Sequence, residues 1–121
     1  MHNFQVDWIS KWAKYTPGKL FLREYNSNRE WTYSEFNNAA NHLANHLTND
    51  LGLKKKDRLA VYSANNAEYV LLFAACVKTG IILVPLNFRL APRELDQLLT
   101  DAEPKVFIYE NMFEENVEKL E

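Results

Sequence analysis

The chain has 121 residues, of which 47% are apolar and 25% are charged, and its formal net charge is −2. This composition is typical of a folded globular domain and excludes the disordered class, which combines low hydrophobicity with high net charge. The near balance of basic and acidic groups excludes the basic footprint of a nucleic-acid-binding domain.

The cysteine count and the N-terminal residues indicate the compartment. One cysteine cannot form an internal disulfide, and the first twenty residues carry three lysines and an aspartate in place of an apolar signal sequence. We therefore expect a cytoplasmic protein. The most apolar stretch, Tyr69–Leu86, has Lys78 near its centre. Because a central lysine costs about 2.5–3.5 kcal/mol on insertion scales, we expect no membrane span.

The first 33 residues predict a helix followed by a β-hairpin. Met1–Tyr15 is an amphipathic helix, because its apolar residues recur at helical spacing: Phe4, Trp8, Ile9 and Trp12. Two strands, Leu20–Tyr25 and Arg29–Tyr33, are joined by the turn formers Asn26–Asn28.

A long helix begins at Thr32. Thr32 and Glu35 have the spacing of a capping box, in which each side chain binds a free backbone N–H of the other residue. One apolar stripe then follows along the helix: Phe36, Ala40, Leu43, Leu47 and Leu51. Gly52 supplies the left-handed residue that ends the helix.

From residue 53 the chain alternates strands and helices. The predicted strands are Leu59–Tyr62, Ile81–Val84 and Lys105–Tyr109, and Pro85 ends the second of them. The predicted helices run from Asn65 or Asn66 to Thr79, from Pro92 to about Leu99, and from Asn111 to Glu121. The first of these helices is apolar on all sides, so we expect it to be buried on most of them.

This order of elements predicts an α/β fold. An N-terminal helix and hairpin precede a β-α-β-α-β-α unit with a parallel sheet, and continuous apolar strands favour a sheet covered on both faces. We expect a single domain over residues 1–121, in which residues 1–52 form the helix, hairpin and long helix, and 53–121 the alternating unit. Residues 101–121 carry two basic and seven acidic groups, which favours a solvated acidic helix.

The residue pattern offers few sites for catalysis. A phosphate-binding loop needs clustered glycines, but Gly18, Gly52 and Gly80 lie at least 28 residues apart. His42 and His46 are four apart, which is compatible with a shared metal ion, although a structural or exposed pair is favoured and no third ligand is obvious.

Nucleophilic chemistry has no better candidate. Cys76 lies in the apolar helix and Ser63 lacks the glycines of a nucleophile elbow. The loops after the first two parallel strands are the usual ligand-facing edge of such a sheet. They make Asn65, Asn66, Asn87 and Arg89 the candidate site residues. Alternatively, the asparagines cap helices or shape turns and Arg89 anchors its loop.

Four segments in order resemble the adenylate-forming (AMP-binding) superfamily, whose members include acyl-CoA synthetases, luciferases and peptide-synthetase adenylation domains. The segments are Trp31–Phe36, Asn65–Tyr69, Lys78–Asn87, and Asn87–Leu90 followed by Glu94-Leu95. The last segment is more similar to the acyl-CoA synthetase branch. Phe88 and Ala91 depart from the proline and the threonine or serine that are usual there, and Ala91 weakens a helix cap.

The resemblance implies the N-terminal part of a larger enzyme. The parent enzyme would use ATP and Mg²⁺ to activate a carboxylic acid as an acyl-adenylate and pass the acyl group to CoA. The family's phosphate loop, nucleotide-binding aspartate and C-terminal lysine come later in its pattern, so no catalytic, cofactor-binding or metal-binding residue is assigned here.

We therefore expect a scaffold segment of an acyl-CoA synthetase that is inactive alone and pairs with the rest of its parent chain. The alternative is a stand-alone α/β interaction or regulatory module. A truncated sheet has open edges and unpartnered apolar faces, so we also expect self-association.

Overall fold

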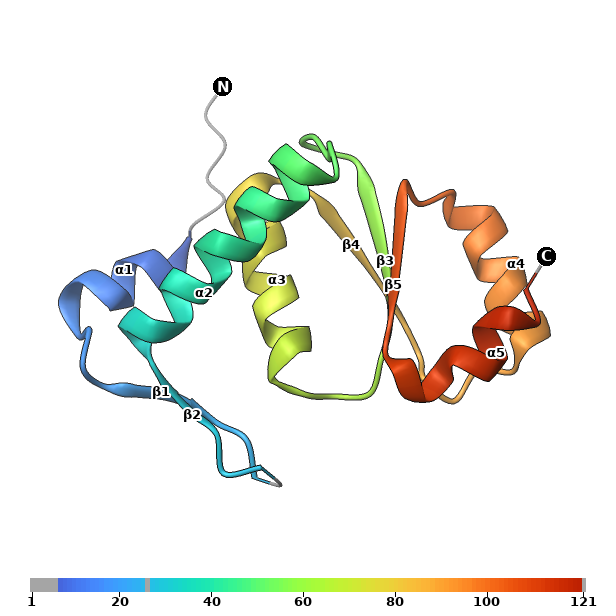
Figure 1. Ribbon diagram of the computed structural model, residues 1–121. Coiled ribbons are helices and arrows are strands. Elements are labelled where there is room, and N and C mark those ends of the chain that lie inside the picture. Colours follow the sequence, from blue (N-terminus) through green and yellow to red (C-terminus); the bar gives the residue numbers. More distant parts are fainter. Residues whose placement is uncertain (1–6, 26, 121) are drawn as a thin grey trace.

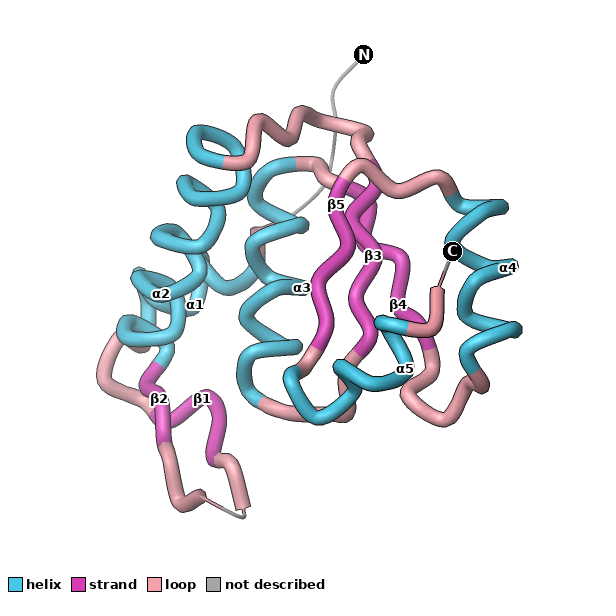
Figure 2. Tube along the Cα trace, turned by 45° about the vertical axis from the view of Figure 1, so that its right-hand side comes forward, coloured by secondary structure: helices cyan, strands magenta, loops and turns pink. Residues whose placement is uncertain are grey.

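The computed structural model describes residues 7–25 and 27–120 and places a central parallel sheet between two layers of helices (Figures 1 and 2). Helices α2 and α3 cover one face of the sheet, and α4 and α5 cover the other. The elements are α1 (Trp8–Tyr15), β1 (Leu20–Arg23), β2 (Glu30–Thr32), α2 (Tyr33–Asn45), a π-helical turn (His46–Asp50), β3 (Arg58–Tyr62), α3 (Ala67–Thr79), β4 (Ile82–Leu86), α4 (Pro92–Ala102), β5 (Val106–Tyr109), a 3₁₀ turn (Asn111–Phe113) and α5 (Glu114–Glu118).

Helix α1 and the β1–β2 hairpin form the N-terminal part of the described chain. The Asp7 carboxylate caps α1 by accepting the backbone N–H of Ser10 at 3.2 Å. Strands β1 and β2 pair antiparallel, as predicted, but they are shorter than the predicted strands. The predicted helix began at Met1; residues 1–6, Phe4 included, lie outside the described residues, as does Asn26 in the hairpin turn.

Helix α2 begins with the predicted capping box. The Glu35 carboxylate accepts the N–H of Thr32 at 2.9 Å, and the Thr32 hydroxyl accepts the N–H of Glu35 at 3.1 Å. The predicted stripe fails at Leu51, which is 41% exposed, because the helix widens into a π-helical turn from His46. That turn rotates Leu51 out of the core, and Leu53, 2% exposed, packs there instead. Gly52 has the predicted left-handed conformation, with φ of +71°.

The sheet has the strand order β4-β3-β5, and both pairings are parallel. Alternate residues of β3 face opposite layers: Leu59 and Val61 pack with α2 and α3, whereas Ala60 and Tyr62 pack with α4. The prediction that Pro85 ends the second strand is wrong, because β4 extends through Pro85, opposite Val61, to Leu86. β4 lies at the edge of the sheet, where a residue without an N–H is tolerated.

Helix α3 lies against the sheet and also against α1 and α2. The Asn66 side chain caps it by accepting the N–H of Tyr69 at 2.9 Å, and Gly80 ends it with φ of +77°. The expectation of burial on most sides is confirmed. Glu68 and Phe73, the latter 47% exposed, are the exposed residues of α3, and its other residues are buried or half-buried.

A buried lysine joins the three helices of this layer. The Lys78 side chain on α3 is 8% exposed. Its ammonium group donates to the Asp7 carboxylate at 2.7 Å, the Ser10 hydroxyl at 2.8 Å and the Asn37 amide oxygen at 2.6 Å. All three of its donors are therefore satisfied.

No described helix combines the length and the hydropathy that a bilayer-spanning helix requires.

The opposite layer consists of α4 and α5. Pro92 occupies the first turn of α4, as predicted, and Leu95 is fully buried beneath it. The predicted helix from Asn111 to Glu121 is instead a 3₁₀ turn followed by the five-residue α5. Glu121 lies outside the described residues.

Candidate functional site

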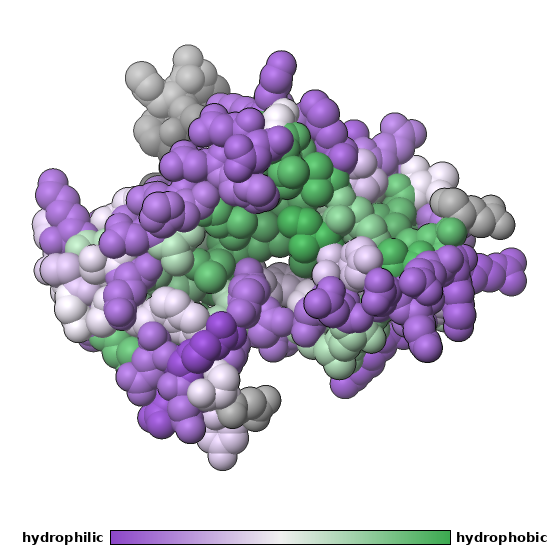
Figure 3. All heavy atoms as spheres, viewed as in Figure 1, coloured by the Kyte–Doolittle hydropathy of each residue, from purple (hydrophilic) through white to green (hydrophobic). Residues whose placement is uncertain are grey.

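A cleft of about 670 Å³ opens at the carboxyl-end edge of the sheet. Its apolar floor comes from β3, α3 and β5, and its polar rim from the hairpin and the loops that follow β3 and β5. The lining residues are Glu24, Arg29, Val61, Ser63, Ala64, Asn65, Asn66, Glu68, Tyr69, Leu72, Ile108, Tyr109, Glu110 and Asn111. Figure 3 shows apolar surface in the middle of this face, over α3 and β5, bordered by hydrophilic surface.

Glu110, which follows β5, holds the loop that follows β3. One oxygen of its carboxylate accepts the Ser63 hydroxyl at 2.8 Å and the Ala64 backbone N–H at 2.7 Å. The Asn66 amide group donates to the Ser63 hydroxyl oxygen at 3.4 Å. The serine hydroxyl therefore donates to a carboxylate. Of the described residues that line the cleft none is a histidine, so Ser63 faces no imidazole base.

Charged residues of the hairpin close the other side of the cleft. The Arg29 guanidinium donates to the carboxylates of Glu24 and Glu68 at 2.8 and 3.1 Å. The second oxygen of Glu24 accepts the N–H of Ala67 in the first turn of α3 at 3.0 Å. These hydrogen bonds fasten the hairpin to the start of α3.

The same hydrogen bonds stabilise the charged forms of Glu24 and Arg29. Hydrogen bonds from the Ser27 hydroxyl, the Ala67 amide and Arg29 lower the pKa of Glu24 to about 2. Hydrogen bonds to Glu68 and Glu24 raise the pKa of Arg29 above its usual range. The Glu24 carboxyl and the Arg29 guanidinium therefore both stay charged near neutral pH.

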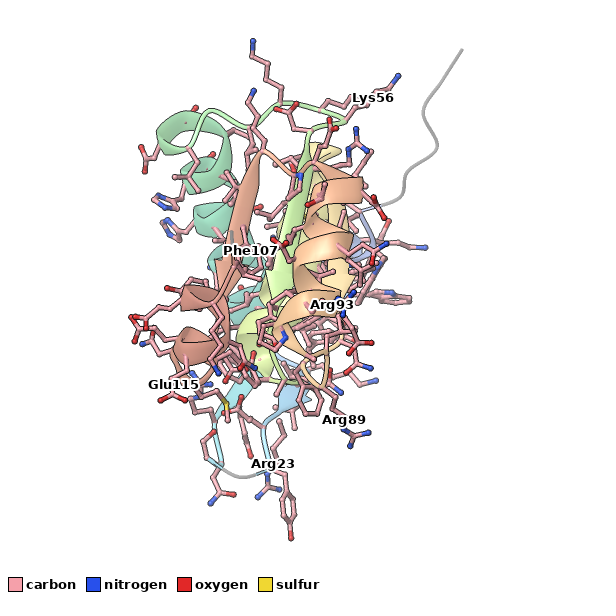
Figure 4. All side chains as sticks on the ribbon, turned by 90° about the vertical axis from the view of Figure 1, so that its right-hand side faces the viewer. Arg23, Lys56, Arg89, Arg93, Phe107 and Glu115 are labelled. Atoms are coloured by element: carbon pink, nitrogen blue, oxygen red, sulfur yellow. The ribbon has the colours of Figure 1, made fainter. Side chains whose placement is uncertain are left out.

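The structure brings three of the four predicted site residues to this edge. Asn65 and Asn66 line the main cleft, and Asn87 joins Asn65 around a neighbouring cavity of about 210 Å³. Arg89 is exposed, with its guanidinium 5.2 Å from the centre of the Phe88 ring. Figure 4 shows Arg89 at the same end of the molecule as Arg23 of the hairpin, and Lys56 at the opposite end.

Two of the asparagines also have the capping and turn roles that the sequence left open. Asn66 caps α3, and the Asn87 side chain accepts the Arg89 N–H at 2.9 Å within its own turn. Tyr62 holds the loop after β4, because its buried hydroxyl donates to the Leu90 carbonyl at 3.1 Å. The same hydroxyl accepts from the Asn116 amide of α5 at 3.1 Å.

The donor groups of the cleft do not fit a nucleotide triphosphate. Glu24, Glu68 and Glu110 place three carboxylates around the opening, and their charges repel phosphate. Arg29, the one cation among the described residues that line the cleft, already binds two of these carboxylates. These residues suit hydrogen bonding to a neutral or cationic group better than binding of an anion.

The remaining candidates for chemistry lie outside the cleft. Cys76 is 3% exposed, and burial raises the pKa of its thiol to about 11, so the thiol stays protonated near neutral pH. His42 and His46 are exposed on α2 and the turn that follows it, and the His46 ring lies 2.7 Å from the Asp50 carboxylate. Within residues 7–25 and 27–120 no three histidine, cysteine, aspartate or glutamate side chains are placed to share a metal ion.

Sequence reasoning missed the charged residues of the cleft. Glu110 could have been found, because it directly follows a parallel strand and so reaches the ligand-facing edge. Arg29 and Glu68 could not, since they are 39 residues apart and meet only because the hairpin packs beside α3.

Comparison with known proteins gives a consistent family assignment. The model of the family described as "AMP-binding enzyme" matches residues 9–121. The chain is 40% identical over 86 residues to a long-chain-fatty-acid–CoA ligase, FadD13, of Mycobacterium tuberculosis, covering 71% of this chain and 17% of that protein. It is 33% identical over 107 residues to a 2-succinylbenzoate–CoA ligase of Oceanobacillus iheyensis, covering 88% of this chain and 22% of that protein.

Solved structures agree with this assignment. The N-terminal domain of FACL13 from Mycobacterium tuberculosis superposes on 98% of this chain with a TM-score of 0.89 and 32% identity, and the chain covers 30% of that structure. The anthranilate CoA ligase AuaEII superposes with a TM-score of 0.85 and 29% identity, over 94% of this chain and 22% of that one. The predicted α/β class is confirmed, and this chain matches a minor part of each relative.

Proposed function

Because the chain belongs to the AMP-binding enzyme family, we propose that it serves as the N-terminal scaffold segment of an acid–CoA ligase. Such a ligase would join a carboxylic acid to ATP as an acyl-adenylate, release pyrophosphate and transfer the acyl group to CoA. The observation that carries the proposal is the match over residues 9–121 together with the superposition on an N-terminal domain of that kind.

The segment's part in that reaction would be structural. It would supply a three-stranded sheet and a hydrogen-bonded edge at which Asn65, Asn66 and Asn87 face the rest of the parent chain. The three carboxylates of the cleft disfavour phosphate there. ATP, Mg²⁺ and CoA would therefore be held by residues of the parent enzyme beyond this segment.

We further propose a fatty acid as the substrate class and the cytoplasm as the compartment. A relative that is 40% identical is named a long-chain-fatty-acid–CoA ligase, which makes fatty acids the first class of carboxylic acid to test. A single buried cysteine, Cys76, is consistent with a reducing cytoplasm.

A chimera tests the proposal directly. This chain replaces the corresponding N-terminal segment of the Mycobacterium tuberculosis long-chain-fatty-acid–CoA ligase, and formation of long-chain acyl-CoA is measured. We expect the chimera to be active, whereas the same ligase with the segment deleted should not be. A chimera that folds but forms no acyl-CoA would contradict the scaffold role.

The isolated chain provides the second half of the test. We expect no pyrophosphate release from ATP and a fatty acid, and no micromolar binding of magnesium ATP by isothermal titration calorimetry. Turnover or tight nucleotide binding by the 121-residue chain alone would overturn the proposal.

A further inference from the structure

We propose that the amino-end edge of the parallel sheet binds an acidic segment of another protein. This surface, called here the basic edge, carries five exposed cationic side chains: Lys54, Lys55, Lys56, Arg58 and Lys105. Figure 4 shows Lys56 at the end of the molecule opposite Arg89. The cleft lies at the carboxyl ends of the same strands, so the inference goes beyond the proposed function and does not depend on it.

Backbone hydrogen bonds bring two separate segments together at this edge. The Lys105 N–H donates to the Arg58 carbonyl at 2.8 Å, which joins the starts of β5 and β3. The turn before β3 closes with a hydrogen bond of 2.9 Å from the Asp57 N–H to the Lys54 carbonyl. The cationic side chains of the turn therefore lie next to those at the starts of the two strands.

Little of this charge is neutralised within the chain. The Lys105 ammonium lies 3.3 Å from the Asp57 carboxylate. The other four cations of the basic edge form no ion pair with any residue that the structure describes. Even when Glu103, exposed two residues before Lys105, is counted with Asp57, five basic groups stand against two acidic ones. The basic edge is thus positive in a chain whose net charge is −2.

Lys56 has a backbone conformation that lysine rarely adopts. Its φ is +75° at the third position of the turn, where glycine or asparagine is favoured because a side chain crowds the left-handed backbone. The Lys56 N–H donates to the Gly80 carbonyl at 2.9 Å, which holds the turn in this shape against the end of α3. Strain of this kind is typical of functional sites. Since the turn itself favours glycine, we attribute the lysine to its charge.

A short acidic polypeptide segment fits this surface better than a nucleic acid does. Carboxylates complement clustered ammonium groups and are steered toward them over a Debye length of about 8–10 Å. The five side chains include no aromatic ring on which a base could stack. Residues 101–121 carry seven acidic groups, which would repel a long polyanion. The charge complementarity therefore favours a partner segment rich in aspartate and glutamate.

Binding of an acidic peptide by the 121-residue chain tests the proposal. The probe is a fluorescent peptide of eight alternating aspartates and glutamates, and the control peptide has asparagine and glutamine in their place. Fluorescence anisotropy is measured at low and at physiological salt. We expect the chain to bind the acidic peptide alone, and less tightly at the higher salt, because salt screens exposed charges. No binding of the acidic peptide at low salt would overturn the proposal.

Variants of Lys56 separate its charge from its effect on stability. Lys56→Gly removes the charge and the strain together, so it should weaken peptide binding about threefold, as expected for one exposed ion pair. Its urea midpoint of unfolding should be equal to or above that of the unchanged chain. Lys56→Asn, a second neutral residue that tolerates the left-handed conformation, should weaken binding to the same extent. Unchanged binding by both variants, or a lower midpoint for Lys56→Gly, would contradict the proposal.

Lys11→Gln and Lys19→Gln are matched controls, since both lysines are exposed and lie outside the basic edge. Each control should bind the peptide as the unchanged chain does. If a control weakens binding as much as Lys56→Gly, the attraction is general and the proposal fails. If a single-stranded oligothymidylate of the same charge binds more tightly than the acidic peptide, the basic edge is a nucleic-acid site and the proposal fails as well.

Discussion

Ala91 is the N-cap residue of α4, and only one of the two hydrogen bonds of a capping box forms there. The Glu94 carboxylate accepts the backbone N–H of Ala91 at 3.1 Å, which is one of the two hydrogen bonds of a capping box. Alanine has no hydroxyl to accept the N–H of Glu94 in return. We expect Ala91→Ser to raise the free energy of unfolding by about 1 kcal/mol, measured by urea denaturation. Ala91→Val restores no hydrogen bond and serves as the control; equal midpoints for Ser and Val would contradict the prediction.

The titration of Glu24 reports whether the β1–β2 hairpin is bound to the start of α3. Its pKa is lowered to about 2 by hydrogen bonds from the Ser27 hydroxyl, the Ala67 amide and Arg29. We expect its side-chain carboxyl resonance to titrate near that value in an NMR pH series. Ser27→Ala removes the largest of these contributions and should move the midpoint toward the ordinary value of 4.5. A midpoint near 4.5 in the unchanged chain would show that the hairpin does not bind α3 in this way.

Helices α1, α2 and α3 are joined through Lys78, and this contact makes a prediction about stability. Asp7→Asn leaves the buried ammonium without a counter-charge. Breaking a fully buried pair costs about 3–5 kcal/mol. Because the Asp7 side chain is 32% exposed, we expect a smaller loss of unfolding free energy, about 2 kcal/mol at neutral pH.

The pH dependence of that loss has a definite sign. Burial by itself raises the pKa of Asp7, but hydrogen bonds from Lys78 and Ser10 outweigh it, so the pKa lies below its ordinary value of 3.8. Because the folded-state pKa is lowered, the ionised Asp7 stabilises the folded state at pH values above 3.8. This stabilisation disappears as the pH falls through the folded-state pKa. The difference between the unchanged chain and Asp7→Asn should therefore be largest well above pH 3.8 and shrink as the pH falls below 3.8. A difference that stays constant across this range would rule out the ion pair as its source.

The elements that local rules determine were predicted best. The Thr32–Glu35 capping box, the start of α3 at Asn65 or Asn66 and the left-handed Gly52 all follow from residues within a few positions of one another. The errors arose where tertiary position decides. Pro85 continues a strand because β4 lies at the sheet edge, and Leu51 leaves the core because α2 ends in a wide turn.

At the scale of the molecule, the sequence indicated which edge of the sheet carries the cleft but not its charges. Asn65, Asn66 and Asn87 follow strands, and parallel strands bring such residues together. The charge of the cleft depends on where the hairpin docks, because Glu24 and Arg29 come from a separate two-stranded sheet. The family could be recognised because four segments resemble it in the same order along the chain. No single segment is specific enough to identify it.

Self-association of the chain remains a prediction, and the described fold now indicates where it would occur. β5 is an edge strand whose residues are all half-buried, whereas the other edge, β4, contains Pro85, which disfavours pairing. We therefore expect two chains to meet along β5 and the adjoining apolar floor of the cleft, with a dimer in sedimentation velocity at high concentration. Met112→Lys, at a 71% exposed position just after β5, should weaken the dimer.

Leu98→Lys is the matched control, because Leu98 is exposed on α4, away from β5. It should leave the dimer unchanged, since an added charge opposes association only where the two copies touch. A monomer at every concentration, or equal weakening by both lysine variants, would show that the β5 edge does not pair. Each result bears on the scaffold role, because an edge that another copy can cover is also available to the rest of a parent chain.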